Sequence, residues 1–233
     1  MGELGRYKIR PYVDIQIIRY WLRCIQGNAP CFVKDCYSYQ YDRTEKGYNC
    51  WGSFVKKLLF KYGFGEVWVN QGVENTDYFL LLFKQRCYDI QRQEWHSNIN
   101  SVPKLRTYCK FKVNLALEKY LNCIDVPIFR NALVSLRLST HSLLIEKGRD
   151  TGLSVEQIIC PFGCKCIEDE YHFVLVCPKY LHFRIKFIPE YYFNPPFEWK
   201  FLLLMKSEKP FTLNNLGKYT FFAMKERRRL LDQ

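Results

Sequence analysis

Apolar residues recur at intervals of three and four along most of the chain, the spacing that places them on one face of an α-helix. From residue 13 to residue 25 this spacing predicts a helix that ends at Gly27–Asn28. A second helix is predicted over 50–63, with Asn49 as its N-cap and Gly63 as its stop.

The same spacing predicts helices over about 75–95, 101–121 and 127–138, the first opening at Asn75 or Thr76. Two helical segments are also expected at the C-terminal end. Alternation with period two, which indicates a strand, is confined to residues 66–69 and to short stubs near 141–145. The pattern therefore predicts a mainly α fold.

The composition, 48% hydrophobic and 17% aromatic over 233 residues, allows a sizeable core and excludes disorder over most of the length. No apolar run is long enough to cross a bilayer, and the charged N-terminus lacks the apolar region of a secretory signal. We therefore expect an intracellular protein, nuclear or cytoplasmic. The 11 cysteines are odd in number and mostly scattered, which argues against a disulfide framework in such a compartment.

The formal net charge is +12, and it is unevenly distributed. Residues 151–178 hold one basic and four acidic side chains, whereas both ends of the chain are basic. An excess of positive charge of this size favours a polyanionic partner such as RNA or DNA.

The acidic stretch contains "CPFGCKCIEDEYHFVLVC", residues 160–177, in which ligand-type side chains are concentrated. The candidates are Cys160, Cys164, Cys166, His172 and Cys177, with His182 in reserve. Zinc takes four ligands in a tetrahedron from cysteine sulfur and histidine nitrogen, so this segment predicts a small zinc-knuckle module. Gly163 is expected to adopt a positive φ that lets the chain turn between the first two cysteines.

Two features of the spacing limit the ligand set. Cys164 and Cys166 are one residue apart, a poor chelate, so one of them is expected to be left over and Cys164 is favoured. His172 and Cys177 are five apart, which is about 140° of rotation on a straight α-helix. They can share a metal only if the helix stops or widens between them.

The stretches "RLSTHSLLIEKGR", "CPFGC" and "EDEYHFVLVCPKY" resemble the C-terminal tail of polyproteins from non-LTR, LINE-type retrotransposons, downstream of the reverse transcriptase. The resemblance extends upstream through "NCWGSFVKKLLFKYGFGEVWVNQGV" and covers most of residues 8–193. The family pattern is Cys-x2-Cys followed by Glu-Asp-Glu-x-His-Phe-x3-Cys-Pro. Carried over by position, it implies zinc ligands at Cys160, Cys164, His172 and Cys177. The extra residue between the first two cysteines, and the added Cys166, keep Cys166 open as an alternative.

The resemblance also implies a role in binding RNA or DNA during target-primed reverse transcription. No catalytic motif accompanies it: the chain has no Tyr-x-Asp-Asp turn, His-Glu-x-x-His pair, phosphate loop or deaminase signature. We therefore expect a non-catalytic protein without a small-molecule substrate. There are two rival hypotheses. One is a structural or protein-interaction helical domain in which zinc only stabilises the fold, and the other is an inert remnant of a decayed retrotransposon.

Phosphate contacts are expected outside the acidic module, on its basic flanks. The candidates are Arg137, His141, Arg149, Arg184, Lys186, Arg227, Arg228 and Arg229. We expect three parts along the chain: a helical domain (1–147), a region that comprises a linker and the zinc-knuckle module (148–187), and a C-terminal helical tail (188–233). The linker is expected over residues 147–159.

Overall fold

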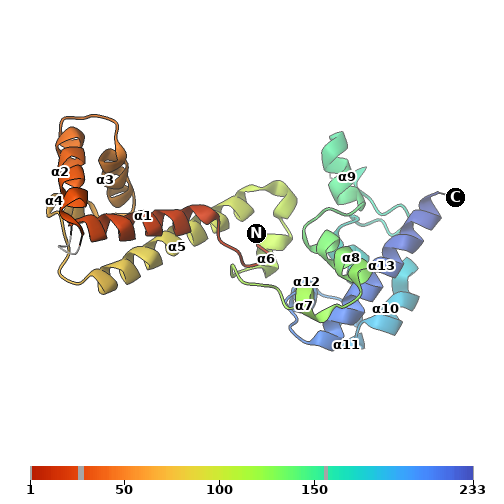
Figure 1. Cartoon of the computed structure of the whole chain (residues 1–233). Helices are drawn as coiled ribbons and strands as arrows, with labels where there is room; N and C mark the ends of the chain where they lie inside the picture. The colour runs from red at the N-terminus through yellow and green to blue at the C-terminus, as the bar shows by residue number, and fades with distance from the viewer. Residues whose placement is uncertain (1, 26–28, 155–156, 233) are drawn as a thin grey trace. The chain divides into compact units, whose positions relative to one another are not determined.

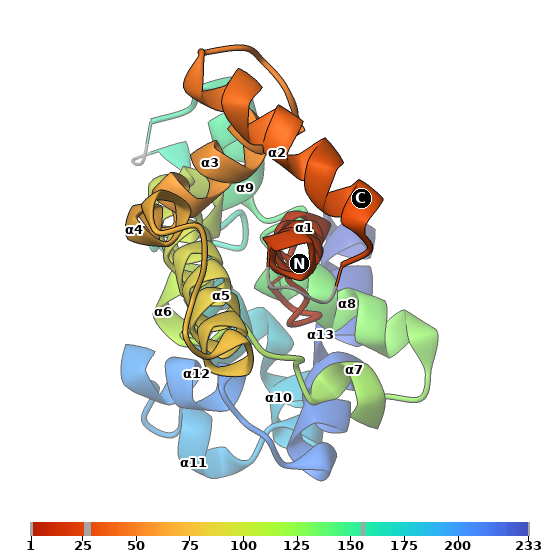
Figure 2. The same cartoon turned by 60° about the vertical axis from the view of Figure 1, so that its left-hand side comes forward.

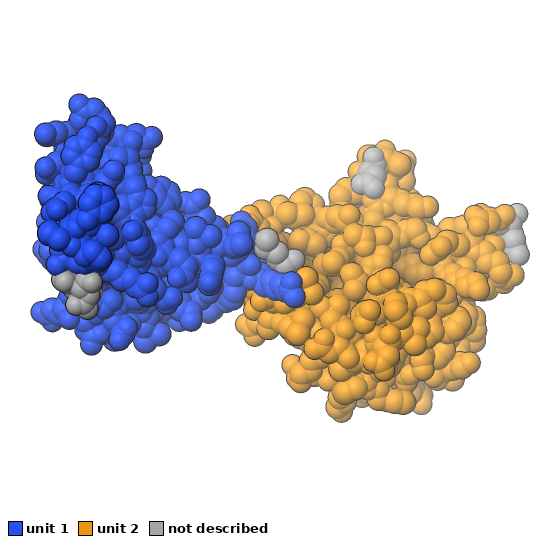
Figure 3. All heavy atoms as spheres, viewed as in Figure 1, with its two compact units in different colours: residues 1, 6–95 blue, residues 2–5, 96–233 orange. Residues whose placement is uncertain are grey.

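The computed structural model describes residues 2–25, 29–154 and 157–232, which are mainly helical (Figure 1). Over these ranges it contains isolated β-bridges but no β-strand. The chain divides into two compact units, residues 6–95 and residues 2–5 with 96–232 (Figure 3). No helix in the described ranges is both long and apolar enough to cross a membrane.

The first unit is built from five helices of the described chain. They are α1 (Ile9–Ile25), α2 (Cys31–Glu45), α3 (Trp51–Lys61), α4 (Gly65–Val69) and most of α5 (Thr76–Ser101). Their apolar faces meet in one core around Trp21, Leu22, Leu59 and Phe83, all completely buried. The core therefore forms where the helical periodicity placed the apolar stripes.

Three of the helices predicted for this unit are confirmed. The predicted end of α1, Gly27–Asn28, lies outside the described residues. Helix α3 begins after Cys50 rather than Asn49, because Cys50 and Ser53 form a reciprocal capping box, and Gly63 follows the helix with φ of +83°. The Asn75 side chain accepts the Tyr78 N–H at 3.0 Å and so caps α5.

Two expectations for this unit need correction. The strand predicted at 66–69 is wrong: these residues form the short helix α4, which is too brief to show a helical period. Helix α2 has no counterpart in the prediction: it contacts the core through the half-buried rings of Tyr37 and Tyr41, and Thr44 is its only fully buried residue.

The second unit consists of shorter elements arranged around one long helix. They are η1 (Pro103–Leu105), α6 (Tyr108–Phe111), α7 (Tyr120–Cys123), α8 (Pro127–Arg137), α9 (Leu144–Thr151), η3 (His172–Val176), η4 (Pro178–Tyr180), α10 (Leu181–Phe187), α11 (Glu190–Phe193), α12 (Glu198–Met205) and α13 (Pro210–Leu231). Helix α13 packs against α7, α8 and α10 (Figures 1 and 2). The domain boundaries expected at 147/148 and 187/188 both lie inside this unit, because α8 and α10 share α13 as their packing partner.

The helix predicted over 127–138 is confirmed as α8, but three other expectations for this unit are wrong. The helix over 101–121 is replaced by η1, α6 and α7, with Lys112 buried between α6 and α7 in an ion pair with Glu118. The stubs near 141–145 form no strand, since residues 141–143 are irregular and helix α9 begins at Leu144, and the first part of the linker over 147–159 is helical as well. Helix α9 ends at Gly152, whose φ of +70° is the left-handed conformation common at helix C-termini.

Candidate metal centre

A tight turn presents the first cysteines of the cluster. Ile159 and Ile167 form an antiparallel bridge, and the Cys160 N–H donates to the Cys166 carbonyl at 2.8 Å. Between them Gly163 has φ of +81°, as predicted, and its N–H lies 3.3 Å from the Cys160 carbonyl. The chain therefore reverses within a few residues, and Cys160 and Cys164 lie on the same side of the turn.

A π-helical turn brings the other two candidates together. Residues His172–Val176 are π-helical, and the Cys177 N–H donates to the His172 carbonyl at 2.8 Å. Since a π-helix bonds residue i to residue i+5, it stacks side chains five apart, which an α-helix would separate by about 140°. The widening that the spacing required is therefore present.

The π-helical turn is held by side chains from its neighbours. The Asp169 carboxylate accepts the His172 N–H at 2.8 Å, which caps the start of the turn. Arg184 donates to the carbonyls of Val174 and Cys177, at 2.9 and 2.7 Å. Tyr219 of α13 donates to the Phe173 carbonyl at 2.6 Å. These bonds satisfy backbone groups in a segment that is almost entirely buried.

The four ligand atoms of Cys160, Cys164, His172 and Cys177 all lie within 4.8 Å of one another. The Cys177 Sγ is 4.0 Å from the Cys160 Sγ and 3.8 Å from the Cys164 Sγ. In a disulfide the two sulfur atoms are about 2.05 Å apart. Two thiolates bound to one tetrahedral zinc, each with a Zn–S distance of about 2.3 Å, have sulfurs about 3.8 Å apart. The cluster has the spacing of a metal site, and it could bind a metal ion.

The imidazole of His172 supports the same conclusion. The residue is 3% exposed, and neither ring nitrogen has a hydrogen-bond partner in the part of the chain described. Burial lowers the pKa of His172, so the ring is neutral near pH 7 and keeps a lone pair free for coordination. Because buried polar atoms are nearly always satisfied, an ion at this position would account for this histidine.

Burial shifts the pKa of the cluster's thiols in the opposite direction from that of His172. Burial raises the pKa of Cys177, an effect that the backbone hydrogen bond from Lys179 offsets only in part, and burial also raises the pKa of Cys164. A bound divalent cation would stabilise the thiolates that burial disfavours.

Metal binding should therefore release protons, and affinity should fall as the pH falls. The group most affected is Cys177, which carries its proton at pH 7 until a cation displaces it. Zinc titrations by calorimetry in two buffers of different ionisation enthalpy would measure the number of protons released. A heat that is independent of the buffer would contradict this expectation.

The two reserve candidates lie elsewhere. Cys166 is exposed, and its Sγ lies 2.9 Å from the Cys164 carbonyl. His182 is exposed on α10, with its ring against Phe183 at 3.9 Å between centroids. The structure thus brings Cys164, and not Cys166 or His182, to the other three side chains.

Three arginines expected to contact phosphate are instead buried inside the protein. Arg227 forms a bidentate ion pair with Glu168, at 2.7 and 2.6 Å, and Arg137 pairs with Glu3 and Glu118 at 3.0 and 2.8 Å. Arg184 is occupied by the carbonyls of the π-helical turn. Each of the three arginines is at most 3% exposed, so their assignment as phosphate contacts is corrected: they hold the fold together.

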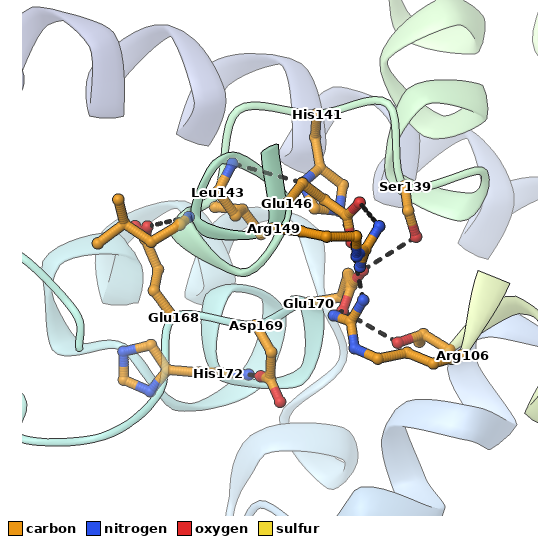
Figure 4. Close-up of polar contacts among 12 residues, drawn as sticks. Arg106, Ser139, His141, Leu143, Glu146, Arg149, Glu168, Asp169, Glu170 and His172 are labelled. Atoms are coloured by element: carbon orange, nitrogen blue, oxygen red, sulfur yellow. Dashed lines mark hydrogen bonds and ion pairs between the residues drawn. The ribbon is translucent and has the colours of Figure 1, made fainter. Parts of the chain in front are cut away.

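Two further candidates belong to a polar network beside the cluster (Figure 4). The His141 Nε2 lies 3.1 Å from Glu170, and Arg149 pairs with Glu146 at 2.6 Å. Arg106 joins both carboxylates, at 2.7 Å each. The His172 ring points away from this network, and two arginines already neutralise its carboxylates, so the network is a set of ion pairs.

The sequence interpretation missed the role of the acidic residues at 168–170. Asp169 lies at the start of the helical turn, where its carboxylate accepts the His172 N–H. Glu168 and Glu170 pair with Arg227 and Arg106, 59 and 64 residues away along the chain. No local pattern signals such partners, since the pairing depends on how distant segments pack.

The remaining predicted contacts, Lys186, Arg228 and Arg229, are exposed on α10 and α13.

Comparisons with protein-family models, with curated proteins and with solved structures found no match to this chain.

Proposed function

We propose that the chain is the non-catalytic, zinc-binding and nucleic-acid-binding C-terminal part of a LINE-type retrotransposon protein. The observation that carries the proposal is the Cys3His cluster of Cys160, Cys164, His172 and Cys177. The resemblance of "CPFGC" and "EDEYHFVLVCPKY" to the retrotransposon tail supports the family.

Zinc is the proposed metal because three sulfurs and one imidazole nitrogen at tetrahedral spacing are ligands that zinc prefers. Four protein ligands leave no open position for a substrate or a reactive water, so the ion's role is structural. It would join the turn at 160–164 to the π-helical segment.

The proposed nucleic-acid contacts are the exposed cations of α10 and α13. Arg228 and Arg229 follow one another near the end of α13, and Lys186 lies on α10, which packs against α13. The buried arginines do not contribute, since their guanidinium groups are occupied by protein oxygens. Phosphate affinity should therefore depend on this face rather than on the metal centre.

Fluorescence anisotropy with labelled RNA and DNA at increasing salt tests this proposal. We expect affinity to fall steeply with salt, and each phosphate contact removed should lower the slope of log affinity against log salt by about 0.9 for duplex DNA and by about 0.7 for single strands. The paired substitution Arg228→Gln and Arg229→Gln should lower both affinity and slope.

The exposed Lys104→Gln in η1 is the matched control and should change neither. An affinity that does not depend on salt, or no binding at all, would contradict the proposal. It would favour a helical interaction domain in which the metal only stabilises the fold.

A further inference from the structure

Half-buried phenylalanine rings lie along the seam between α10 and α13. The Phe222 ring of α13 is nearly parallel to two rings of α10: Phe187 at 4° and 5.8 Å between centroids, and Phe183 at 19° and 6.2 Å. The Phe129 ring of α8 lies 5.9 Å from Phe222 on another side. Three near-parallel rings therefore form a short stack that reaches the surface between two helices.

A groove opens at this stack. Its volume is about 490 Å³, and it is lined by Phe183, Phe222, Lys225, Glu226, Arg228 and Arg229. This volume falls within the range of about 300–1,000 Å³ that is usual for small-ligand sites. The two rings supply an apolar floor, and charged side chains form the rest of the lining.

The charge of the groove is positive. Lys225, Arg228 and Arg229 are exposed, and the single carboxylate of the lining, Glu226, is paired with Arg229 at 2.7 Å. Lys186 extends the positive charge over the α10 side, since its Nζ lies 5.4 Å from the centre of the Phe187 ring. Cations therefore border the aromatic floor on both helices.

We infer that this groove binds an unpaired base of single-stranded nucleic acid, with the base stacked on the rings of Phe183 and Phe222 and the flanking phosphates on Lys225, Arg228 and Lys186. The inference rests on the proposed function and adds to it the strand state of the ligand. A flat base matches an aromatic floor, and the phosphates on either side of it match cations at the rim.

Double-stranded nucleic acid does not fit this arrangement equally well. In a duplex both faces of each base are covered by its neighbours, so the rings of the groove would have no base to stack against. A duplex would still meet the cations, and it should bind through phosphate contacts alone. The difference between single-stranded and duplex affinity therefore reports on the rings.

The test uses the full chain loaded with zinc and a 12-nucleotide single strand that carries 2-aminopurine at its centre, as DNA and as RNA. A hairpin duplex and an abasic strand of equal charge serve as comparison ligands. We expect the abasic strand to bind about tenfold more weakly, because one stacked base contributes about 1–3 kcal/mol. The fluorescence of 2-aminopurine should change on binding, since it reports stacking of that base.

Phe222→Leu should remove the preference for the base-containing strand and the fluorescence change, while binding to the abasic strand stays as in wild type. Phe211→Leu, on the same helix at a 74% exposed position, is the matched control and should behave as wild type. Lys225→Gln, an exposed position whose change cannot disturb the core, should weaken all three ligands and lower the salt slope.

The outcomes separate the two proposals. Loss of base preference in Phe222→Leu alone would support the groove as the base site. Equal affinity of wild type for the strand, the hairpin and the abasic ligand would overturn this inference and leave the proposed function standing. Absence of salt-dependent binding to every ligand would overturn the proposed function and this inference with it.

Discussion

Cys164→Ser should abolish stoichiometric zinc binding, whereas Cys166→Ser should retain one equivalent of zinc per chain. The Cys164 Sγ lies 3.8 Å from the Cys177 Sγ within the cluster, while Cys166 is exposed and outside it. Replacing a coordinating thiolate by a hydroxyl should weaken binding by more than the roughly 10–100-fold typical of changes to outer-shell partners. Metal analysis of the purified full-length variants measures this directly.

His172→Ala and His182→Ala form a second matched pair for the same question. The first removes the buried imidazole whose nitrogens lack partners in the described chain, and the second removes an exposed one on α10. We expect zinc to be lost only from the His172 variant. A chain that loses zinc with Cys166 or His182, and keeps it without Cys164 or His172, would show that a different ligand set is used.

Arg227→Met should destabilise the second unit by about 3–5 kcal/mol, because it leaves the buried carboxylate of Glu168 without its partner. Both side chains are at most 2% exposed, and the bidentate contact joins Glu168 to α13. The effect should appear as a lower denaturant midpoint in urea unfolding of the zinc-loaded protein. Arg228→Met, on the exposed side of the same helix, should change stability by less than about 0.5 kcal/mol.

The double variant Arg227→Met with Glu168→Met distinguishes an unpaired charge from lost packing. Replacing both members of a buried ion pair by apolar residues is often neutral. It should recover most of the stability, although the Leu144 N–H, which donates to Glu168 at 2.8 Å, would lose its acceptor. A destabilisation by the double variant equal to the sum of the two single variants would contradict a coupled pair.

Much of the fold follows from local pattern. The helices α1, α3, α5 and α8 carry apolar stripes with a helical period, and their caps and stops are encoded in adjacent residues such as Asn75 and Gly63. Helix α2 was missed because it contacts the core mainly through two tyrosines, Tyr37 and Tyr41, and strongly apolar residues do not recur along it with a helical period. The region 101–121 was misassigned because apolar spacing alone does not reveal that Lys112 is drawn into a buried ion pair, where the chain turns instead of continuing as a helix.

The candidate cluster was visible in the sequence for a related reason. Its four members lie within residues 160–177, so only a turn and one helix start had to be inferred. The five-residue interval from His172 to Cys177 even required a break or a widening in the helix, and the structure meets that requirement with a π-helical turn. The choice between Cys164 and Cys166 needed the direction of each side chain within the turn.

The sequence by itself therefore determined the helical class, most of the first core, the candidate ligands and the excess of positive charge. Only the tertiary structure decided which cations remain available at the surface. Arg137, Arg184 and Arg227 look no different along the chain from Arg228 and Arg229, yet the first three are buried and paired. The physical reason is that burial of a charge depends on carboxylates and carbonyls from other segments of the chain, which come together only when the elements of the second unit pack.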